Sequence, residues 1–186
     1  FNYSLSFPLM LIILVVPSIF IIQSSPKKRF LTYMLVLALI IFIVIWNNVE
    51  RSRNFENTAY IFLFVYFSFI TFFLFKDLLR SKEITPSVII GAFAGYFMIG
   101  VMFFFIFGFL DGYFPDTTNV DVIEENGVQD MVYFSFITLT TIGYGDFSPT
   151  SSLGQKIAIL EGLIGQFYIA IVMAILVGKF LTHDNK

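Results

Sequence analysis

The chain alternates between long apolar stretches and short polar segments. Five of the apolar stretches are long enough to cross a bilayer, which takes ~20 residues of helix. They lie at about residues 3–22, 30–46, 59–75, 88–110 and 156–181. Pro8 and Pro17 predict a kink in the first stretch. A buried helix of a soluble protein is the alternative for any one stretch, but five leave almost no polar residues to cover them, so we predict an all-α membrane protein.

Composition supports this fold class and narrows the possible functions. Hydrophobic residues make up 58% and charged residues 13% of the 186 positions, against about 45–50% and 25% in soluble domains. Cysteine is absent, so neither a disulfide nor a thiolate metal site is expected. The sequence shows no cluster of a nucleophile, a general base and an orienting group of the kind that an enzyme needs. Nothing in it suggests a nucleic-acid partner. We therefore expect that the protein is not an enzyme, requires no cofactor and does not bind nucleic acid.

Basic residues gather on one side of the predicted spans, and this orients the chain. Short loops on the cytoplasmic side of a membrane are rich in Lys and Arg. One side holds Lys27, Lys28, Arg29, Lys76, Arg80, Lys82, Lys179 and Lys186, and the other holds Arg51, Arg53 and Lys156. This segregation places residues 111–150 and Phe1 outside. An external start implies an odd number of spans, so either the protein has five or a further helix lies upstream; because the chain begins with Phe, we favour the second.

A distinctive motif lies between the last two spans. Residues 133–146 read as a short amphipathic helix that runs into the glycine-alternating segment Thr141-Ile142-Gly143-Tyr144-Gly145. Glycine adopts backbone conformations that are closed to other residues, so successive carbonyls can point along one axis and replace the water around a cation. One chain supplies one wall of such a pore, which predicts a homotetramer in the lipid bilayer. The alternative is a glycine-rich re-entrant turn or an extracellular loop, but the two flanking spans favour a pore.

Residues 140–146 resemble the signature of the potassium channel family, in which such a carbonyl filter is established. The resemblance covers about residues 86–180 and implies a tetrameric, re-entrant pore-loop channel of prokaryotic-like type. It divides the chain into peripheral transmembrane helices (1–83) and a pore domain (84–186), with an outer helix (88–110), a pore helix (about 130–140), a filter (141–145) and an inner helix (about 156–181).

The resemblance also assigns the ion-binding residues. Dehydrated K⁺ would bind the backbone carbonyls of Thr141, Ile142, Gly143 and Tyr144 and the Thr141 hydroxyl, with Gly145 completing the filter. Related nonselective channels carry aspartate where this chain has Tyr144. Tyr144 therefore favours selectivity for K⁺.

Residues behind the filter are expected to support it. The resemblance points to Thr140 and Asp146 beside the filter, and to packing of Tyr144 on the pore-helix rings of Tyr133 and Phe134. Some bacterial relatives carry a glutamate paired with the aspartate that follows the filter, and Ile137 occupies that position here. We expect a hydrogen bond from Tyr133 to Asp146 in its place.

The inner helix carries several candidate residues. The resemblance puts a gating hinge at Gly165, which would locally loosen the helix, whereas close packing through Gly162 and Gly165 is the alternative. Gln166, Ile169 and Met173 share one helical face, and the resemblance places that face on the central cavity.

One acidic residue lies deep in the inner helix. A carboxyl group inside a membrane is costly and suggests a functional partner. Glu161 could bond to the hydroxyl of Ser135 or Thr138, in a protonated form, or could instead reach interfacial water.

The segment before the filter is acidic. It holds Asp111, Asp116, Asp121, Glu124, Glu125 and Asp130, with no Lys or Arg among them. Ordinary solvation explains part of this, but such a cluster would also concentrate cations at a pore mouth. Neutralising it should lower the conductance mainly at low ionic strength, which single-channel recording in dilute and concentrated KCl would measure. An unchanged conductance in dilute KCl would contradict this role.

Gating and location are predicted only broadly. The span 59–75 has no basic residue, and voltage sensing needs several along one span, so we expect no conventional voltage sensor. A weakly selective cation channel and a nonconducting regulatory membrane subunit are the alternative functions. The compact chain and its resemblance predict a multi-pass protein of a plasma membrane, namely a bacterial inner membrane, with an extracellular pore mouth.

Overall fold

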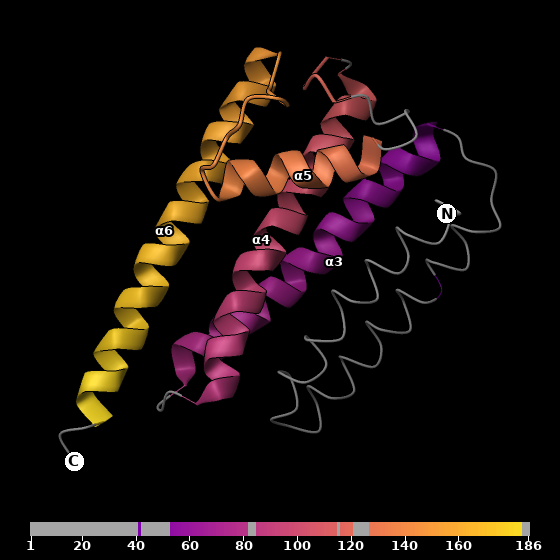
Figure 1. Cartoon of the computed structure of the whole chain (residues 1–186). Coiled ribbons are helices and arrows are strands. Elements are labelled where there is room, and N and C mark those ends of the chain that lie inside the picture. Colours follow the sequence, from indigo (N-terminus) through magenta and orange to yellow (C-terminus); the bar gives the residue numbers. More distant parts are fainter. Residues whose placement is uncertain (1–40, 42–52, 82–84, 115, 121–126, 184–186) are drawn as a thin grey trace.

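The protein was analysed as a computed structural model, which describes residues 41, 53–81, 85–114, 116–120 and 127–183. These residues form the helices α3 (Arg53–Arg80), α4 (Pro86–Tyr113), α5 (Gly127–Leu139) and α6 (Ser152–His183), shown in Figure 1. The predicted spans at 3–22 and 30–46 lie outside the described residues, except for residue 41.

Three of the described helices are long and apolar enough to cross a membrane. They run over Asn57–Arg80, Val88–Tyr113 and Ser152–Leu181, and they contain the stretches predicted at 59–75, 88–110 and 156–181. Helices suit these stretches because lipid offers no hydrogen-bond partner to the backbone, and a helix satisfies its own groups. The prediction of an all-α membrane protein is confirmed.

The starts of α4 and α6 follow from local sequence signals. Thr85 has an extended backbone, and Pro86 begins α4 at the first helical position, where its missing N–H is not needed. At α6 the Ser151 hydroxyl accepts a hydrogen bond from the Gly154 N–H at 3.0 Å, which is the usual side-chain cap.

The short helix α5 lies across the long helices (Figure 1). It packs against both α4 and α6, while α3 packs along α4. The end of α5 near Leu139 lies beside α6, because the Leu139 carbonyl approaches Gly165. This arrangement carries the residues after α5 to the flank of α6, with α5 in contact with both α4 and α6.

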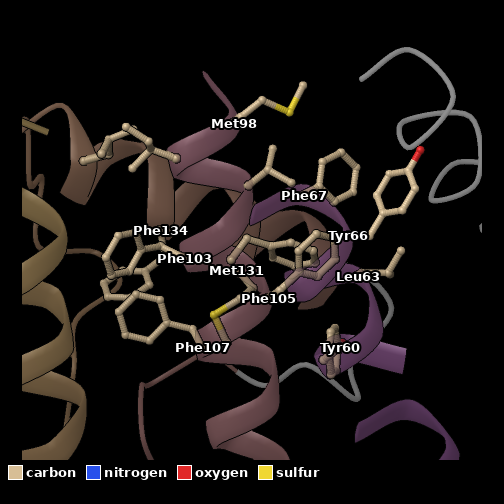
Figure 2. Close-up of a cluster of buried hydrophobic side chains, with 14 of the residues drawn as sticks. Tyr60, Leu63, Tyr66, Phe67, Met98, Phe103, Phe105, Phe107, Met131 and Phe134 are labelled. Carbon is tan, nitrogen blue, oxygen red and sulfur yellow. The ribbon is translucent and has the colours of Figure 1, made fainter. Parts of the chain in front are cut away.

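Aromatic side chains fill the space between α3, α4 and α5. Figure 2 shows rings from all three helices in one cluster. Phe67 of α3 stacks on Phe105 of α4 with ring centroids 5.5 Å apart, and Phe107 meets Phe134 of α5 edge-on at 4.9 Å. Lipid is as apolar as these rings, so close packing rather than exclusion of water holds them together.

Glycines let α4 approach each of its neighbours closely. A Cβ at Gly108 or Gly112 would lie within 3 Å of a side chain of α3, namely Tyr60 or Asn57. A Cβ at Gly100 would lie 2.9 Å from the Phe136 ring of α5. The spacing of Gly108 and Gly112 is the small-residue pattern that brings membrane helices together.

The far end of α6 is tied to the end of α3. Lys179 donates hydrogen bonds to the carbonyls of Leu78 at 3.0 Å and Leu79 at 3.3 Å. These carbonyls belong to the last turn of α3, where the helix leaves acceptors free and favours a positive charge. Lys179 is thus more than a membrane-surface anchor, because it joins the inner helix to a peripheral one.

Candidate functional site

The pore helix α5 ends in a tight turn that leads into the predicted filter. The N–H of Thr141 donates to the Thr138 carbonyl at 3.0 Å, and the N–H of Ile142 donates to the Ile137 carbonyl at 2.9 Å. This pair of bonds is the Schellman arrangement, which places one residue in the left-handed region and usually employs glycine there. Thr141 occupies that position with φ of +59°. A β-branched residue is strained there, and such strain tends to collect at functional sites.

The next residues alternate between left-handed and ordinary backbone. Gly143 has φ of +53° and Gly145 has φ of +85°, whereas Ile142 and Tyr144 do not have positive φ. All of residues 141–145 are exposed within the single chain. Both glycines therefore lie where the backbone is left-handed, as expected from their unusual conformational freedom.

Thr140 and Thr141, at the inner end of the predicted filter, form side-chain hydrogen bonds that connect this segment to α5 and α6. The Thr141 hydroxyl donates to the Thr140 carbonyl at 2.6 Å and accepts a bond from Gln166 of α6 at 3.2 Å. The Thr140 hydroxyl turns back to the Phe136 carbonyl at 2.7 Å. Gln166, predicted to face the pore, thus lies beside the inner end of residues 141–145.

The expected contact between Tyr133 and Asp146 is present. The Tyr133 hydroxyl donates to Asp146 Oδ2 at 2.8 Å. This hydrogen bond lowers the pKa of the Asp146 carboxyl below its ordinary value and raises the pKa of the Tyr133 hydroxyl. The bond is therefore fully present at neutral pH. It is lost as the pH falls through the lowered pKa of Asp146, and also as the pH rises through the raised pKa of Tyr133.

We expect Tyr133→Phe to weaken the outer end of the filter. Without the hydroxyl, the pKa of Asp146 should return toward its ordinary 3.8, so external acid should reduce K⁺ current at a higher pH than in the unaltered protein. Current recorded during steps of external pH measures this shift. Tyr113→Phe removes a hydroxyl from the end of α4 and is the control. Identical acid responses of Tyr133→Phe and the unaltered protein would contradict the role of the bond.

The packing expected between Tyr144 and Phe134 is not formed within one chain. Phe134 is only 2% exposed and lies in the core against Phe107, while Tyr144 is 73% exposed. Tyr133 places its ring against Phe147 at 6.0 Å instead. The prediction for Phe134 is wrong within the chain, because α5 turns that residue toward α4 and away from residues 141–145. Packing of Tyr144 against another subunit stays a prediction.

Asn119 forms hydrogen bonds with the segment that follows the predicted filter. The sequence alone did not predict this role for Asn119. Its side-chain amide donates to the Asp146 carbonyl at 3.1 Å and accepts from the Ser148 N–H at 2.6 Å. Its backbone N–H donates to the Ser148 carbonyl at 3.0 Å, and Thr118 forms an isolated bridge with Pro149. The only signal in the sequence is a polar amide in a loop, which is too common to single out.

We expect Asn119→Ala to destabilise the outer end of the filter and reduce steady K⁺ flux a few-fold. It removes two side-chain hydrogen bonds, each of about 1 kcal/mol, that fix residues 146 and 148. Asn119→Asp keeps the acceptor for Ser148 and loses only the donor to Asp146, so its flux should lie between the two. Flux into vesicles with the purified protein measures the order, and equal flux in all three proteins would dispose of the prediction.

The acidic residues predicted at the pore mouth are described only in part. Asp116 is exposed, whereas Asp111 and Asp130 are half-buried. Asp121, Glu124 and Glu125 lie outside the described residues. The predicted effect of this cluster on conductance stays a prediction.

The inner helix touches the pore helix at Gly165. A Cβ on Gly165 would lie 2.4 Å from the Leu139 carbonyl oxygen and 2.9 Å from the Leu139 side chain. A Cβ on Gly162 would find nothing closer than the Thr138 carbonyl at 3.7 Å. Of the two interpretations of Gly165, this geometry supports close packing, and the hinge stays a prediction. Gly162 is not needed for the contact.

Ile169 and Met173 face a groove in the single chain. They are 43% and 54% exposed, and with residues of α4 such as Phe93 they line an apolar space of about 540 Å³ between α4 and α6. Their predicted place on a central cavity depends on neighbouring copies and stays a prediction.

Glu161 is held within the chain. It is fully buried, and its Oε1 lies 2.5 Å from the hydroxyl of Ser135. The Thr138 hydroxyl bonds to the Phe134 carbonyl instead. Of the alternatives for Glu161, contact with Ser135 is therefore confirmed, and contact with interfacial water is wrong for this arrangement.

Comparison with known proteins agrees with this arrangement. Residues 87–182, from the start of α4 to the end of α6, match the ion channel family. The chain belongs to that family. It is a channel protein rather than an enzyme, and the resemblance to potassium channels predicted from residues 140–146 is confirmed by its relatives.

Several potassium channel proteins are similar to part of this chain. A probable potassium channel protein 2 of Methanocaldococcus jannaschii is 35% identical over 68 residues, which are 36% of this chain and 19% of that protein. Two pore potassium channel c of Oryza sativa is 30% identical over 99 residues, 52% of this chain and 20% of the relative.

A voltage-gated potassium channel regulatory subunit of Rattus norvegicus is 29% identical over 91 residues, 49% of this chain and 17% of that protein. The chain thus spans about a fifth of the length of the relatives that it matches. No solved structure matches it.

Proposed function

We propose that this chain is the pore-forming subunit of a potassium-selective channel, with residues 141–145 as the selectivity filter. The observation that carries the proposal is the alternation at the end of α5. Gly143 and Gly145 have positive φ, while Ile142 and Tyr144, each of which directly precedes one of these glycines, have exposed side chains. Backbone that alternates in this way can turn successive carbonyls toward one side, as a filter for dehydrated cations needs.

The ion-binding groups would be the carbonyls of Thr141, Ile142, Gly143 and Tyr144 together with the Thr141 hydroxyl. K⁺ is the transported ion here, and no resident cofactor is required. The C-terminal end of α5 lies directly before these residues, and the partial negative charge of a helix C-terminus favours a cation there. The potassium channel relatives support K⁺ as the ion.

The proposed assembly is a homotetramer in the bilayer. One chain offers a single wall of carbonyls, and residues 141–145 are exposed within it. The membrane-spanning part of α6 is only 17% buried, compared with 50% for α4. Irregular backbone at membrane depth is tolerated only where protein or a wet cavity surrounds it. Three further copies around the filter would supply that surrounding.

The remaining parts of the proposal concern orientation and gating. The distribution of Lys and Arg favours an extracellular pore mouth, and the resemblance and compact chain lead us to place the channel in a bacterial inner membrane. The span Asn57–Arg80 carries its two basic residues, Lys76 and Arg80, near its C-terminal end rather than along its length. This favours a channel that is not opened by a conventional voltage sensor.

The decisive experiment is ion flux through the purified protein in lipid vesicles. We expect K⁺ uptake to exceed Na⁺ uptake strongly, and Gly143→Asp to abolish both. Equal uptake of K⁺ and Na⁺ would favour the alternative of a weakly selective cation channel. Crosslinking of the same sample should stop at four chains, and a different end point would contradict the tetramer.

A nonconducting regulatory subunit is the second candidate, favoured by the similarity to the rat regulatory subunit. The same vesicles distinguish it from the first. K⁺ uptake by the purified chain alone, lost in Gly143→Asp, would exclude it. No uptake from correctly assembled protein would support it.

A further inference from the structure

A buried series of polar contacts connects the three helices of the proposed pore domain, α4, α5 and α6. Glu161 of α6 is fully buried and lies within the predominantly apolar span Ser152–Leu181. Its Oε1 lies 2.5 Å from Ser135 Oγ of α5, and Ser135 Oγ lies 2.8 Å from the Gly100 carbonyl oxygen of α4. Glu161 Oε2 is also buried, with no hydrogen-bond partner among the described residues.

The number of protons available to Glu161, Ser135 and Gly100 determines which group donates each of these hydrogen bonds. A serine hydroxyl has one proton to donate, yet Ser135 Oγ lies within bonding distance of two oxygens. The Gly100 carbonyl can only accept. If Glu161 were ionised it could also only accept, and one of the two short contacts would have no proton. Both are satisfied when a protonated Glu161 donates to Ser135 and Ser135 donates to Gly100.

The surroundings of Glu161 also favour the neutral form. No cation pairs with it in the part of the chain that the structure describes, and Lys156 lies on the same helix but is exposed. An unpaired carboxylate is strongly disfavoured at membrane depth, and the unpartnered Oε2 would leave half of its charge without a donor. A neutral carboxyl leaves only one weak acceptor unfilled.

Glu161 and Gly165 together set how α6 lies against α5. They are one helical turn apart on α6, and their contacts on α5, Ser135 and Leu139, are also one turn apart. Residues four apart share a helix face, so two aligned contacts fix both the distance and the register of the helices. Leu139 lies two positions before Thr141, so this register determines where the filter begins.

We propose that Glu161 carries a proton and, as a donor to Ser135, positions the pore helix that holds the filter. The proposal rests on the proposed channel function for its effect on ion flux. Glu161 is a positioning residue, since it acts through Ser135 and touches no filter residue. Its role requires a hydrogen-bond donor and not a negative charge.

Infrared spectroscopy of the protein in lipid vesicles tests the protonation without any measurement of flux. We expect the carbonyl band of a protonated carboxylic acid at neutral pH, shifted when the chain is made with isotopically labelled glutamate. The band should vanish in Glu161→Gln and persist in Asp130→Asn. Absence of a label-sensitive band in the unaltered protein would overturn the proposal, whatever the variants do.

Ion flux and thermal unfolding test the positioning. Glutamine retains a donor, so Glu161→Gln should keep K⁺ uptake and the preference for K⁺ over Na⁺ within about twofold. Leucine has a similar volume and no donor, so Glu161→Leu should unfold at a lower temperature and lose several-fold of the preference. If Glu161→Leu does not assemble, Ser135→Ala removes the same link from α5 and should give the same loss.

The outcomes separate this inference from the channel proposal. A large loss of K⁺ uptake in Glu161→Gln would show that the charge itself is needed and would overturn the inference. Full selectivity in both Glu161→Leu and Ser135→Ala would overturn the positioning role. A protein that shows the band but conducts no ions would contradict the channel proposal and leave Glu161 protonated.

Discussion

Gly143→Ala should abolish K⁺ uptake by vesicles that contain the purified protein. Gly143 has φ of +53°, where an L-residue with a Cβ costs about 1–2 kcal/mol. A tetramer repeats that cost four times around one pore, so the conducting arrangement would lose roughly 4–8 kcal/mol. Since about 1.4 kcal/mol corresponds to a tenfold change, we expect flux to fall by roughly 10³-fold or more.

Two control proteins separate the backbone requirement from other effects of the added methyl group. D-alanine at position 143 adopts positive φ without strain, so a semisynthetic chain that contains it should recover much of the flux. Gly178→Ala adds a methyl group to α6 where nothing lies within 4 Å, and it should leave flux unchanged. Equal flux in Gly143→Ala and Gly178→Ala would contradict the filter assignment.

Gly165→Ala should destabilise the assembled protein by about 1–3 kcal/mol per chain, the usual cost of overpacking a close contact. The added Cβ would lie 2.4 Å from the Leu139 carbonyl oxygen, which is backbone and cannot turn aside like a flexible side chain. Either α6 or the end of α5 must move, and the end of α5 leads directly into the proposed filter. A lower unfolding temperature and a weaker preference for K⁺ over Na⁺ would measure these two consequences.

Gly162→Ala is the matched control, one turn earlier on the same helix. Its Cβ would meet no atom closer than 3.7 Å, so it should be neutral or slightly stabilising, because alanine favours a helix by up to ~1 kcal/mol over glycine. The hinge interpretation of Gly165 gives a different result for Gly165→Ala, namely an unchanged or higher unfolding temperature with a lower open probability. Thermal unfolding of the two variants therefore decides between packing and hinge.

For the proposed pore helix α5, the sequence predicts the helix itself but not the direction in which each side chain points. Its existence followed from a short apolar run before Thr141, and its observed limits, Gly127–Leu139, agree with the predicted 130–140. The sequence could not show which of these side chains faces the core, because Tyr133 and Phe134 are adjacent aromatic residues with similar propensities. The packing of α5 on α4 assigns Phe134 to the core and leaves Tyr133 free to reach Asp146.

The spans and the glycines of the filter were determined by the sequence itself. Apolar length dictates helices in lipid regardless of their neighbours, and positions 143 and 145 have the positive φ that glycine adopts without strain. Asn119, Gly165 and Glu161 acquire their roles only from residues distant in the chain, such as Asp146, Leu139 and Ser135. Their side chains could serve many purposes, so the three-dimensional packing of α4, α5 and α6 was needed to choose among them.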